Sequence, residues 1–279
     1  MEIEADLHLH SHHSDGVLSP SLLVEQAARL GLKAIALTDH DSVDGVREAR
    51  EAAPAGLEVV PGAELSASYR GRDIHLLAYD LDPGDAGLRA FLEPLRHERR
   101  SRAERIVARL NDAGVPVTMA EVEAIAGAAG TRAATSIGRP HIADAIVRHG
   151  AAADLDDAFA RWLRRGQPGY VPRRTLTVAE AIGMVRSHGG AIVVAHPSLN
   201  LPDSDVEALA LEGLDGIEVF HPKQNDDQRR RLAEIARRLG LPASGGSDFH
   251  GPGRSRHALG AAGVGLEALR RLRERARGA

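Results

Sequence analysis

The sequence contains no cysteine. This absence excludes disulfide bonds, thiolate metal sites and thiol nucleophiles, so any metal ion has to be held by histidine, aspartate and glutamate side chains. Aromatic residues are also scarce, at 3% of the chain, whereas hydrophobic residues make up 43%. We therefore expect a sizeable core that is packed mainly by alanine, leucine and valine.

Long apolar runs and an excess of positive charge are missing as well. No run approaches the length of a membrane span, and the acidic start lacks the apolar segment of a signal peptide, so we expect a cytoplasmic protein without a membrane partner. The formal net charge of −4 argues against a surface that coats nucleic acid, but it leaves a nucleotide or the end of an oligonucleotide open as substrate. A chain of 279 residues fits one large domain, or one domain with an insert.

Histidine, in contrast, is concentrated near the start of the chain. His8 and His10 are two residues apart and alternate with leucines, so on a strand both imidazoles point to the same face. Imidazole is the commonest protein ligand for transition metals, and Asp15 adds a carboxylate just beyond the strand. A solvated cluster or a purification tag would lack the alternation with apolar residues. The stretch therefore predicts a metal site.

Short segments with the pattern of buried strands alternate with amphipathic helices over much of the chain. Strands are expected near residues 6–10, 34–37, 58–60, 73–79, 191–194, 216–219 and 241–244. The alternation implies parallel pairing and an α/β fold. Almost every strand ends in, or carries, a histidine, aspartate or glutamate, and the carboxyl ends of barrel strands converge on one face. Ligands that are scattered over the sequence would therefore meet in one place.

The rhythm changes between residues 88 and 165, where only helices are expected. Thr118 is placed to cap one of these helices, with Glu121 at its third position, and a charged run over residues 96–105 fits a solvated helix face. We interpret residues 88–165 as a helical insert that covers the active site of a barrel formed by residues 1–87 and 166–279.

The order and spacing of these motifs resemble the PHP (polymerase and histidinol-phosphatase) phosphoesterases. The resemblance covers nearly the whole chain and is carried by His8-Leu9-His10, Thr38-Asp39-His40-Asp41, Gly62-Ala63-Glu64, His75, Ala195-His196-Pro197 and Ser247-Asp248-Phe249-His250. The insert, Gly138-Arg139-Pro140-His141 and Pro168-Gly169-Tyr170-Val171 are most like the bacterial branch that dephosphorylates nucleoside 3′,5′-bisphosphates, some members of which are also 5′→3′ exoribonucleases on short RNA. The implied fold is a distorted seven-stranded (β/α) barrel with a helical insert.

The resemblance also implies two or three divalent metal ions, manganese first, with iron, zinc or magnesium as alternatives. The implied ligands form three groups: His8, His10, Glu64 and Asp248; Glu64, as a bridge, with His75 and His196; and Asp15, His40 and His250. Asp39 and Asp41 are interpreted as residues that orient ligand imidazoles. The histidines that match no ligand position are interpreted as surface or supporting residues: His12, His13, His188, His221 and His257.

The implied reaction is hydrolysis of a phosphate monoester of a nucleotide by metal-activated water, most simply nucleoside 3′,5′-bisphosphate to nucleoside 5′-monophosphate and phosphate. Three divalent ions and three carboxylates leave about three positive charges, which suits a phosphate dianion. Arg139 and His141 are the expected catalytic residues, with Arg139 on substrate phosphate. Arg132 and Arg173 are further candidates for substrate binding, and solvated surface arginines are the alternative.

Several other functions stay open. Within the same family, the chain could be a histidinol-phosphatase or a cyclic-phosphate hydrolase, and a non-catalytic metal-binding module is a third alternative. A metal amidohydrolase would want a lysine between two metals, but neither Lys33 nor Lys223 follows a convincing strand among the ligands. The expected partner is a small nucleotide or the 5′ end of a short RNA, without a stable nucleic-acid complex, and the sequence predicts no oligomeric state.

Overall fold

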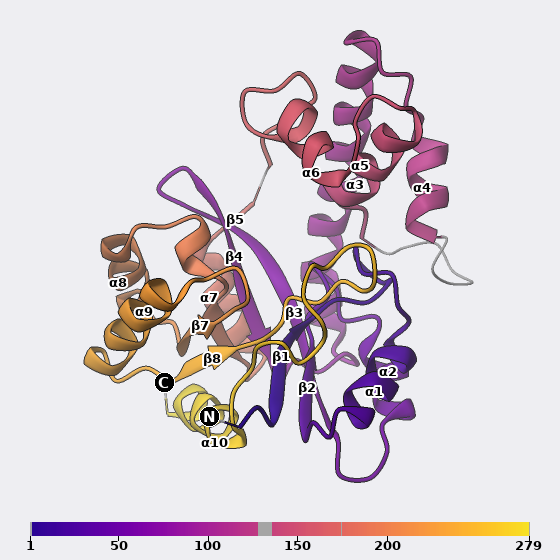
Figure 1. Ribbon diagram of the computed structural model, residues 1–279. Helices are drawn as coiled ribbons and strands as arrows, with labels where there is room; N and C mark the ends of the chain where they lie inside the picture. Colours follow the sequence, from indigo (N-terminus) through magenta and orange to yellow (C-terminus); the bar gives the residue numbers. More distant parts are fainter. Residues whose placement is uncertain (1, 128–135, 174, 279) are drawn as a thin grey trace.

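The computed structural model describes residues 2–127, 136–173 and 175–278, and its centre is a mixed β-sheet that is nearly closed into a barrel (Figure 1). Along the sheet, the strands follow the order β1 (Ala5–Leu9), β2 (Ala34–Leu37), β3 (Glu58–Tyr69), β4 (Arg72–Tyr79), β6 (Ala191–Val194), β7 (Gly216–Phe220) and β8 (Ala243–Gly245). The two-residue β5 (Leu176–Thr177) pairs with β3 outside this path. Just past β8, the Phe249 carbonyl accepts a hydrogen bond from the His10 amide at 3.0 Å, which brings the two ends together. The predicted seven-stranded α/β barrel is confirmed.

One strand, β4, departs from the expectation of parallel pairing. β4 is antiparallel to both β3 and β6. The reason is the connection, since only Arg70 and Gly71 separate the two strands and a parallel crossover needs a much longer segment. Both residues have positive φ, 47° and 74°, as a two-residue hairpin turn requires.

Helices cover the outside of the barrel, with α1 and α2 on one flank and α8 and α9 on the opposite flank in Figure 1. They are α1 (Pro20–Arg29), α2 (Val46–Ala52), α7 (Val178–Ser187), α8 (Asp203–Leu211), α9 (Asp226–Arg238) and α10 (Leu266–Arg277), with a short 3₁₀ turn at Pro197–Leu199. Two of these helices begin at a capping side chain: Ser19 accepts from the amide of Leu22, and Thr177 exchanges hydrogen bonds with Glu180. Among the described residues, no helix combines the length and hydropathy needed to cross a membrane.

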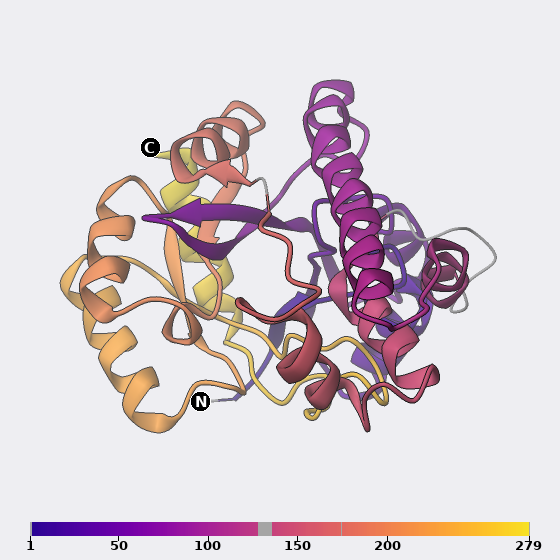
Figure 2. The ribbon, with the colours of Figure 1, turned by 90° about the horizontal axis from the view of Figure 1, so that it is seen from above.

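A group of helices between β4 and β5 rises above the barrel (Figures 1 and 2). It comprises α3 (Ala86–Asp112), α4 (Met119–Gly127), α5 (Arg139–Arg148), α6 (Leu155–Ala158) and a π-helical turn at Phe159–Leu163. The start of α3 packs on the barrel core through Leu88 and Leu92, whereas buried side chains between Ala103 and Val171 form a separate hydrophobic cluster. The exact division into insert and barrel at residues 88 and 165 stays a prediction.

Candidate metal centre and substrate cavity

Two histidines of β1 face two carboxylates across a buried gap. The Nε2 atoms of His8 and His10 lie 3.5 and 3.2 Å from Glu64 Oε2, and 3.6 and 3.5 Å from Asp248 Oδ1. Both imidazoles are fully buried, and neither Nε2 atom has a hydrogen-bond partner in the described part of the chain. The alternation of β1 aims both rings to one side, as the spacing predicted.

His8 is held from behind by a residue that the sequence did not single out. Its Nδ1 atom lies 2.9 Å from Glu218 Oε1 of β7, and the other oxygen of Glu218 accepts from the amide of His196 at 2.6 Å. Glu218 is completely buried, so solvent screens the interaction between its charge and the imidazole only weakly. A carboxylate on the far nitrogen fixes the tautomer of a metal-binding histidine and raises its basicity. The only available signal was an acidic residue inside an otherwise apolar strand.

Glu64 lies between two groups of imidazoles. Its Oε1 atom is 2.7 Å from His75 Nδ1 and 3.1 Å from His196 Nε2, while Oε2 is 3.0 Å from His40 Nδ1. Because β4 runs antiparallel to β3, His75 reaches this place from the middle of its strand rather than from a strand end. Glu64, His75, His196 and His40 would thus be able to hold cations on both oxygens of the carboxylate.

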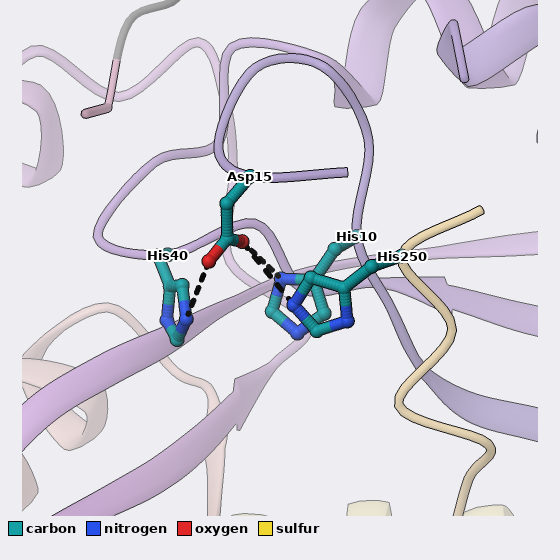
Figure 3. Close-up of side chains that lie close together, drawn as sticks. All are labelled: His10, Asp15, His40 and His250. Carbon is teal, nitrogen blue, oxygen red and sulfur yellow. Dashed lines mark ion pairs between the residues drawn. The ribbon is translucent and has the colours of Figure 1, made fainter. Parts of the chain in front are cut away.

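Asp15 gathers a further group of histidines (Figure 3). Its carboxylate oxygens lie 3.2 Å from His250 Nε2, 3.6 Å from His40 Nε2 and 3.9 Å from His10 Nδ1. The structure thus brings together all nine predicted ligand residues, and three ligand atoms or more come within 4.8 Å of one another in several combinations.

The donor set fits divalent cations. Burial disfavours charge on His10, yet the carboxylates of Asp248 and Glu64 raise its pKa to about 10. The carboxylates thus attract positive charge at His10, and a cation bound there would displace a proton. The donors are nitrogen and oxygen without sulfur, which suits manganese, iron, zinc or magnesium. Within the described residues, the buried Nδ1 atoms of His40, His75 and His196 also have no hydrogen bond of good geometry.

Asp39 and Asp41 were expected to orient the imidazoles of the predicted ligands, but neither carboxylate is hydrogen-bonded to one of them in the described structure. Asp39 accepts from the Ser11 amide at 2.8 Å, and from the hydroxyls of Ser11 and Ser14 at 2.6 Å. Ser14 Oγ in turn lies 3.4 Å from His10 Nδ1, so Asp39 reaches a ligand only through a serine.

Asp41 instead organises two arginines. The chain turns at this residue with φ of 52°, which directs its carboxylate to Arg99 Nε at 2.5 Å, to Arg173 Nη2 at 2.9 Å and to the Ser66 amide at 2.9 Å. His196 and Asp248 also have positive φ, 30° and 52°. Such conformations cost about 1–3 kcal/mol each and persist only where the surroundings enforce them, as at functional sites.

A cavity of about 270 Å³ adjoins the metal ligands and contains four arginines, which we call the arginine cluster. Its members are Arg99, Arg102, Arg139 and Arg173. Arg102 donates from Nε to the Val171 carbonyl at 2.9 Å, while its Nη2 atom is buried without a partner in the described structure. Burial, together with the positive charge of Arg139, lowers the pKa of Arg102 to about 10. The cavity is therefore poised for an anion.

The predicted substrate residues lie in different places. Arg139 begins α5 and stands over the ring of Phe159, 5.7 Å from its centroid. Arg173, 8% exposed, lies in the cavity rather than on the solvated surface. Arg132 is outside the described residues. Arg99 and Arg102 were missed because they belong to a charged run that is typical of a solvated helix face.

His141 has a different environment from the one expected of a catalytic residue. Its side chain is 2% exposed, and its Nδ1 atom accepts a hydrogen bond from the Gly138 amide at 3.1 Å. It is not among the residues that line the arginine-containing cavity. The structure therefore shows His141 capping the start of α5, and its catalytic role stays a prediction.

His221 and Lys223, which follow β7, both contact the carboxylate of Asp248. The Lys223 amide donates to His221 Nδ1 at 3.2 Å, which leaves the His221 Nε2 hydrogen to point at Asp248 Oδ2, 3.3 Å away. Lys223 Nζ donates to the same oxygen at 3.0 Å. His221 is a buried supporting residue, one of the two interpretations that the sequence left open. Lys223 lies among the ligands, contrary to the expectation.

Comparisons with known proteins agree with this site. The model of the PHP domain matches residues 6–115. A 5′-3′ exoribonuclease of Haemophilus influenzae is 36% identical over 253 residues, which cover 88% of this chain and 90% of the relative. A 3′,5′-nucleoside bisphosphate phosphatase of Chromobacterium violaceum is 35% identical over 262 residues, or 91% of this chain and 90% of the relative. A solved structure from Bifidobacterium adolescentis, described as a metal-dependent phosphoesterase, is similar with a TM-score of 0.87 and 35% identity, over 97% of this chain and 96% of that chain.

The chain therefore belongs to the PHP family. It is a metal-dependent phosphoesterase, a hydrolase that acts on phosphoric esters. The resemblance read from the sequence motifs is confirmed.

Glu218 provides a test of the metal centre. Glu218→Gln keeps the volume but removes the charge behind His8, so we expect metal affinity to fall by about 10–100-fold, the usual effect of losing such a partner. Competition with a fluorescent chelator measures this affinity. Glu234→Gln, on the exposed face of α9, is the control and should leave it unchanged. Equal affinities of the Glu218→Gln and parent proteins would show that Glu218 has only a packing role.

Proposed function

We propose that this phosphoesterase hydrolyses nucleoside 3′,5′-bisphosphates to nucleoside 5′-monophosphates and phosphate, and that it also removes nucleotides from the 5′ end of short RNA. The observation that carries this proposal is a single cavity lined both by predicted metal ligands and by four arginines. The predicted metal ligands form one wall, and the arginine cluster lies beside them. A substrate with two phosphates would engage both regions.

The charges of the arginine cluster support a second phosphate. Asp41 is paired with Arg99 and Arg173 and is the one carboxylate to which the described structure bonds this cluster directly. The four positive charges of the cluster thus exceed the one negative charge of Asp41. A guanidinium group also presents a planar fork that matches phosphate oxygens. An unpaired buried Arg102 Nη2 costs free energy that a phosphate oxygen would relieve.

The metal ligands would act on the other phosphate. We propose two or three divalent ions, manganese first, held by the three ligand groups that surround Glu64 and Asp15. When bound, such ions supply an activated water and neutralise charge on the phosphoryl oxygens. In the balanced reaction, the water oxygen bonds to phosphorus, the bond from phosphorus to the 3′-oxygen breaks, and the 3′-oxygen takes up a proton. The arginine cluster would hold the 5′-phosphate in place meanwhile.

Loss of metal ligands tests the reaction. His40→Ala and Asp248→Ala should each lower metal content and abolish phosphate release, because each removes a ligand from a shared site, while the circular dichroism spectrum stays that of the parent. Chelation should silence the parent enzyme, and added Mn²⁺ should restore it. Full activity of metal-depleted His40→Ala protein would contradict a mechanism with several metal ions.

Arg139 tests the second anion region. Arg139→Ala should leave metal content unchanged and reduce kcat/KM for adenosine 3′,5′-bisphosphate. The reduction should correspond to a loss of about 2–4 kcal/mol in transition-state stabilisation, the usual effect of losing one positioned charged donor. Arg139→Lys should recover only part of the loss, since an ammonium lacks the fork. Hydrolysis of p-nitrophenyl phosphate should change much less. A parent-like kcat/KM on the bisphosphate would make Arg139 structural.

Substrate choice tests the proposal itself. The parent enzyme should prefer adenosine 3′,5′-bisphosphate over adenosine 3′-monophosphate by more than about 200-fold, beyond what a single methylene-sized contact provides. A phosphate-release assay should include adenosine 5′-monophosphate, a cyclic nucleotide and histidinol phosphate. Equal rates on the bisphosphate and on either monophosphate would reduce the enzyme to a general phosphoesterase.

A further inference from the structure

A second cavity, of about 300 Å³, adjoins the metal ligands on their other side. It shares part of its wall with the arginine-containing cavity, namely Pro140, Phe159, Lys223, Asp248 and His250. The rest of its lining comes from α6, from Pro222 after β7, and from the loop that follows β8, which lies below the insert in Figure 1. The predicted metal ligands Asp248 and His250 therefore lie between two cavities that differ in their lining.

The lining of the second cavity combines apolar and cationic groups. Leu155 and Pro222 join Pro140 and Phe159 as apolar lining, and Phe159 provides an aromatic ring of the kind on which a base stacks. The volume is at the lower end of the range for small-molecule sites, which leaves room for about one nucleotide.

Arg254 is the observation that points to an anionic or polar ligand. Its side chain is only 10% exposed, and Nη2 pairs with Asp144 of α5 at 2.5 Å. The Nη1 atom, however, is buried and has no hydrogen-bond partner in the described structure. An unpaired buried donor on a charged group is costly, so an acceptor on a bound molecule would stabilise the site.

The chemistry of 5′-end removal indicates which molecule would bind in the second cavity. When the bond between the 3′-oxygen and phosphorus breaks in RNA, the remaining chain stays attached to the phosphoryl group at the metal centre. If the first nucleotide lies in the arginine-containing cavity, the second nucleotide has to leave the metal centre on another side. The second cavity opens at that place and shares Asp248 and His250 with the centre.

We propose that the second cavity binds the nucleotide on the 3′ side of the scissile phosphate of a 5′-phosphorylated RNA, with Arg254 Nη1 donating to it. This inference rests on the proposed function, because it extends the same site by one nucleotide. In the reaction, water adds to phosphorus, the 3′-oxygen of the first nucleotide takes up a proton, and the second nucleotide leaves with a 5′-phosphate.

Two diesters with the same reacting atoms test the proposal. One is the 5′-phosphorylated diadenylate pApA, and the other is 5′-phosphoadenosine 3′-(propyl phosphate), in which a propyl group replaces the second nucleoside. With the Mn²⁺-loaded parent, we expect kcat/KM for pApA to be higher by roughly 5–150-fold, the range that stacking of one base supplies. Arg254→Ala should reduce this ratio at least fivefold, and Arg254→Lys should restore part of it.

Asp144→Ala is the matched control, because it breaks the same ion pair and leaves the Arg254 guanidinium in place. If Arg254 contacts the second nucleotide, Asp144→Ala keeps most of the parental ratio. An equal loss in both variants would make Arg254 structural and overturn the proposal. Should Arg254→Ala fail to fold, Leu155→Asp, which adds a negative charge to the same cavity, should lower the ratio instead.

The outcomes separate this inference from the proposed function. A parent that cleaves adenosine 3′,5′-bisphosphate and both diesters, with a ratio near one, refutes the second-nucleotide site alone. A parent that cleaves the bisphosphate but neither diester also refutes the proposed action on RNA. A parent that fails on the bisphosphate refutes the proposed function, and failure on all three substrates refutes both.

Discussion

The burial of one carboxylate, that of Glu64, is the constraint on which the rest of the site depends. This side chain is 1% exposed and lies within 3.5 Å of imidazole nitrogens from five histidines, namely His8, His10, His40, His75 and His196. A charge so deeply buried is stable only if positive charge compensates it. Each strand of the barrel that supplies a histidine is thereby held in register around one oxygen pair.

The supporting residues follow from the same requirement. Glu218 fixes His8 from behind, and Asp39 reaches His10 through Ser14, so ring orientations are set before any cation binds. Asp41 ties the insert to the barrel, because Arg99 comes from α3 and Arg173 from the segment that returns to the barrel. The orientation of the arginine-containing cavity thus depends on a residue adjacent to the predicted ligand His40.

The sequence predicted the barrel well, and it singled out nine side chains that the structure brings together, because strand periodicity and strand-end chemistry are local properties. His8 and His10 could be placed on one face from their spacing alone. The antiparallel β4 was not predicted, since the turn at Arg70 and Gly71 resembles many exposed loops. Arg99, Arg102 and Glu218 were overlooked because their importance depends on contacts with residues distant in sequence. The capping contact of His141 was not predicted either, since its motif carries no sign that it caps a helix.

The most direct test of a bridging Glu64 is anomalous diffraction from crystals grown with Mn²⁺. The structure leads us to expect separate manganese peaks on the two sides of the Glu64 carboxylate, one near His8 and His10 and the other near His75 and His196. Those peaks should disappear together in Glu64→Gln crystals of the same form. A single peak remote from Glu64, or two peaks that survive the substitution, would contradict the central role of this carboxylate.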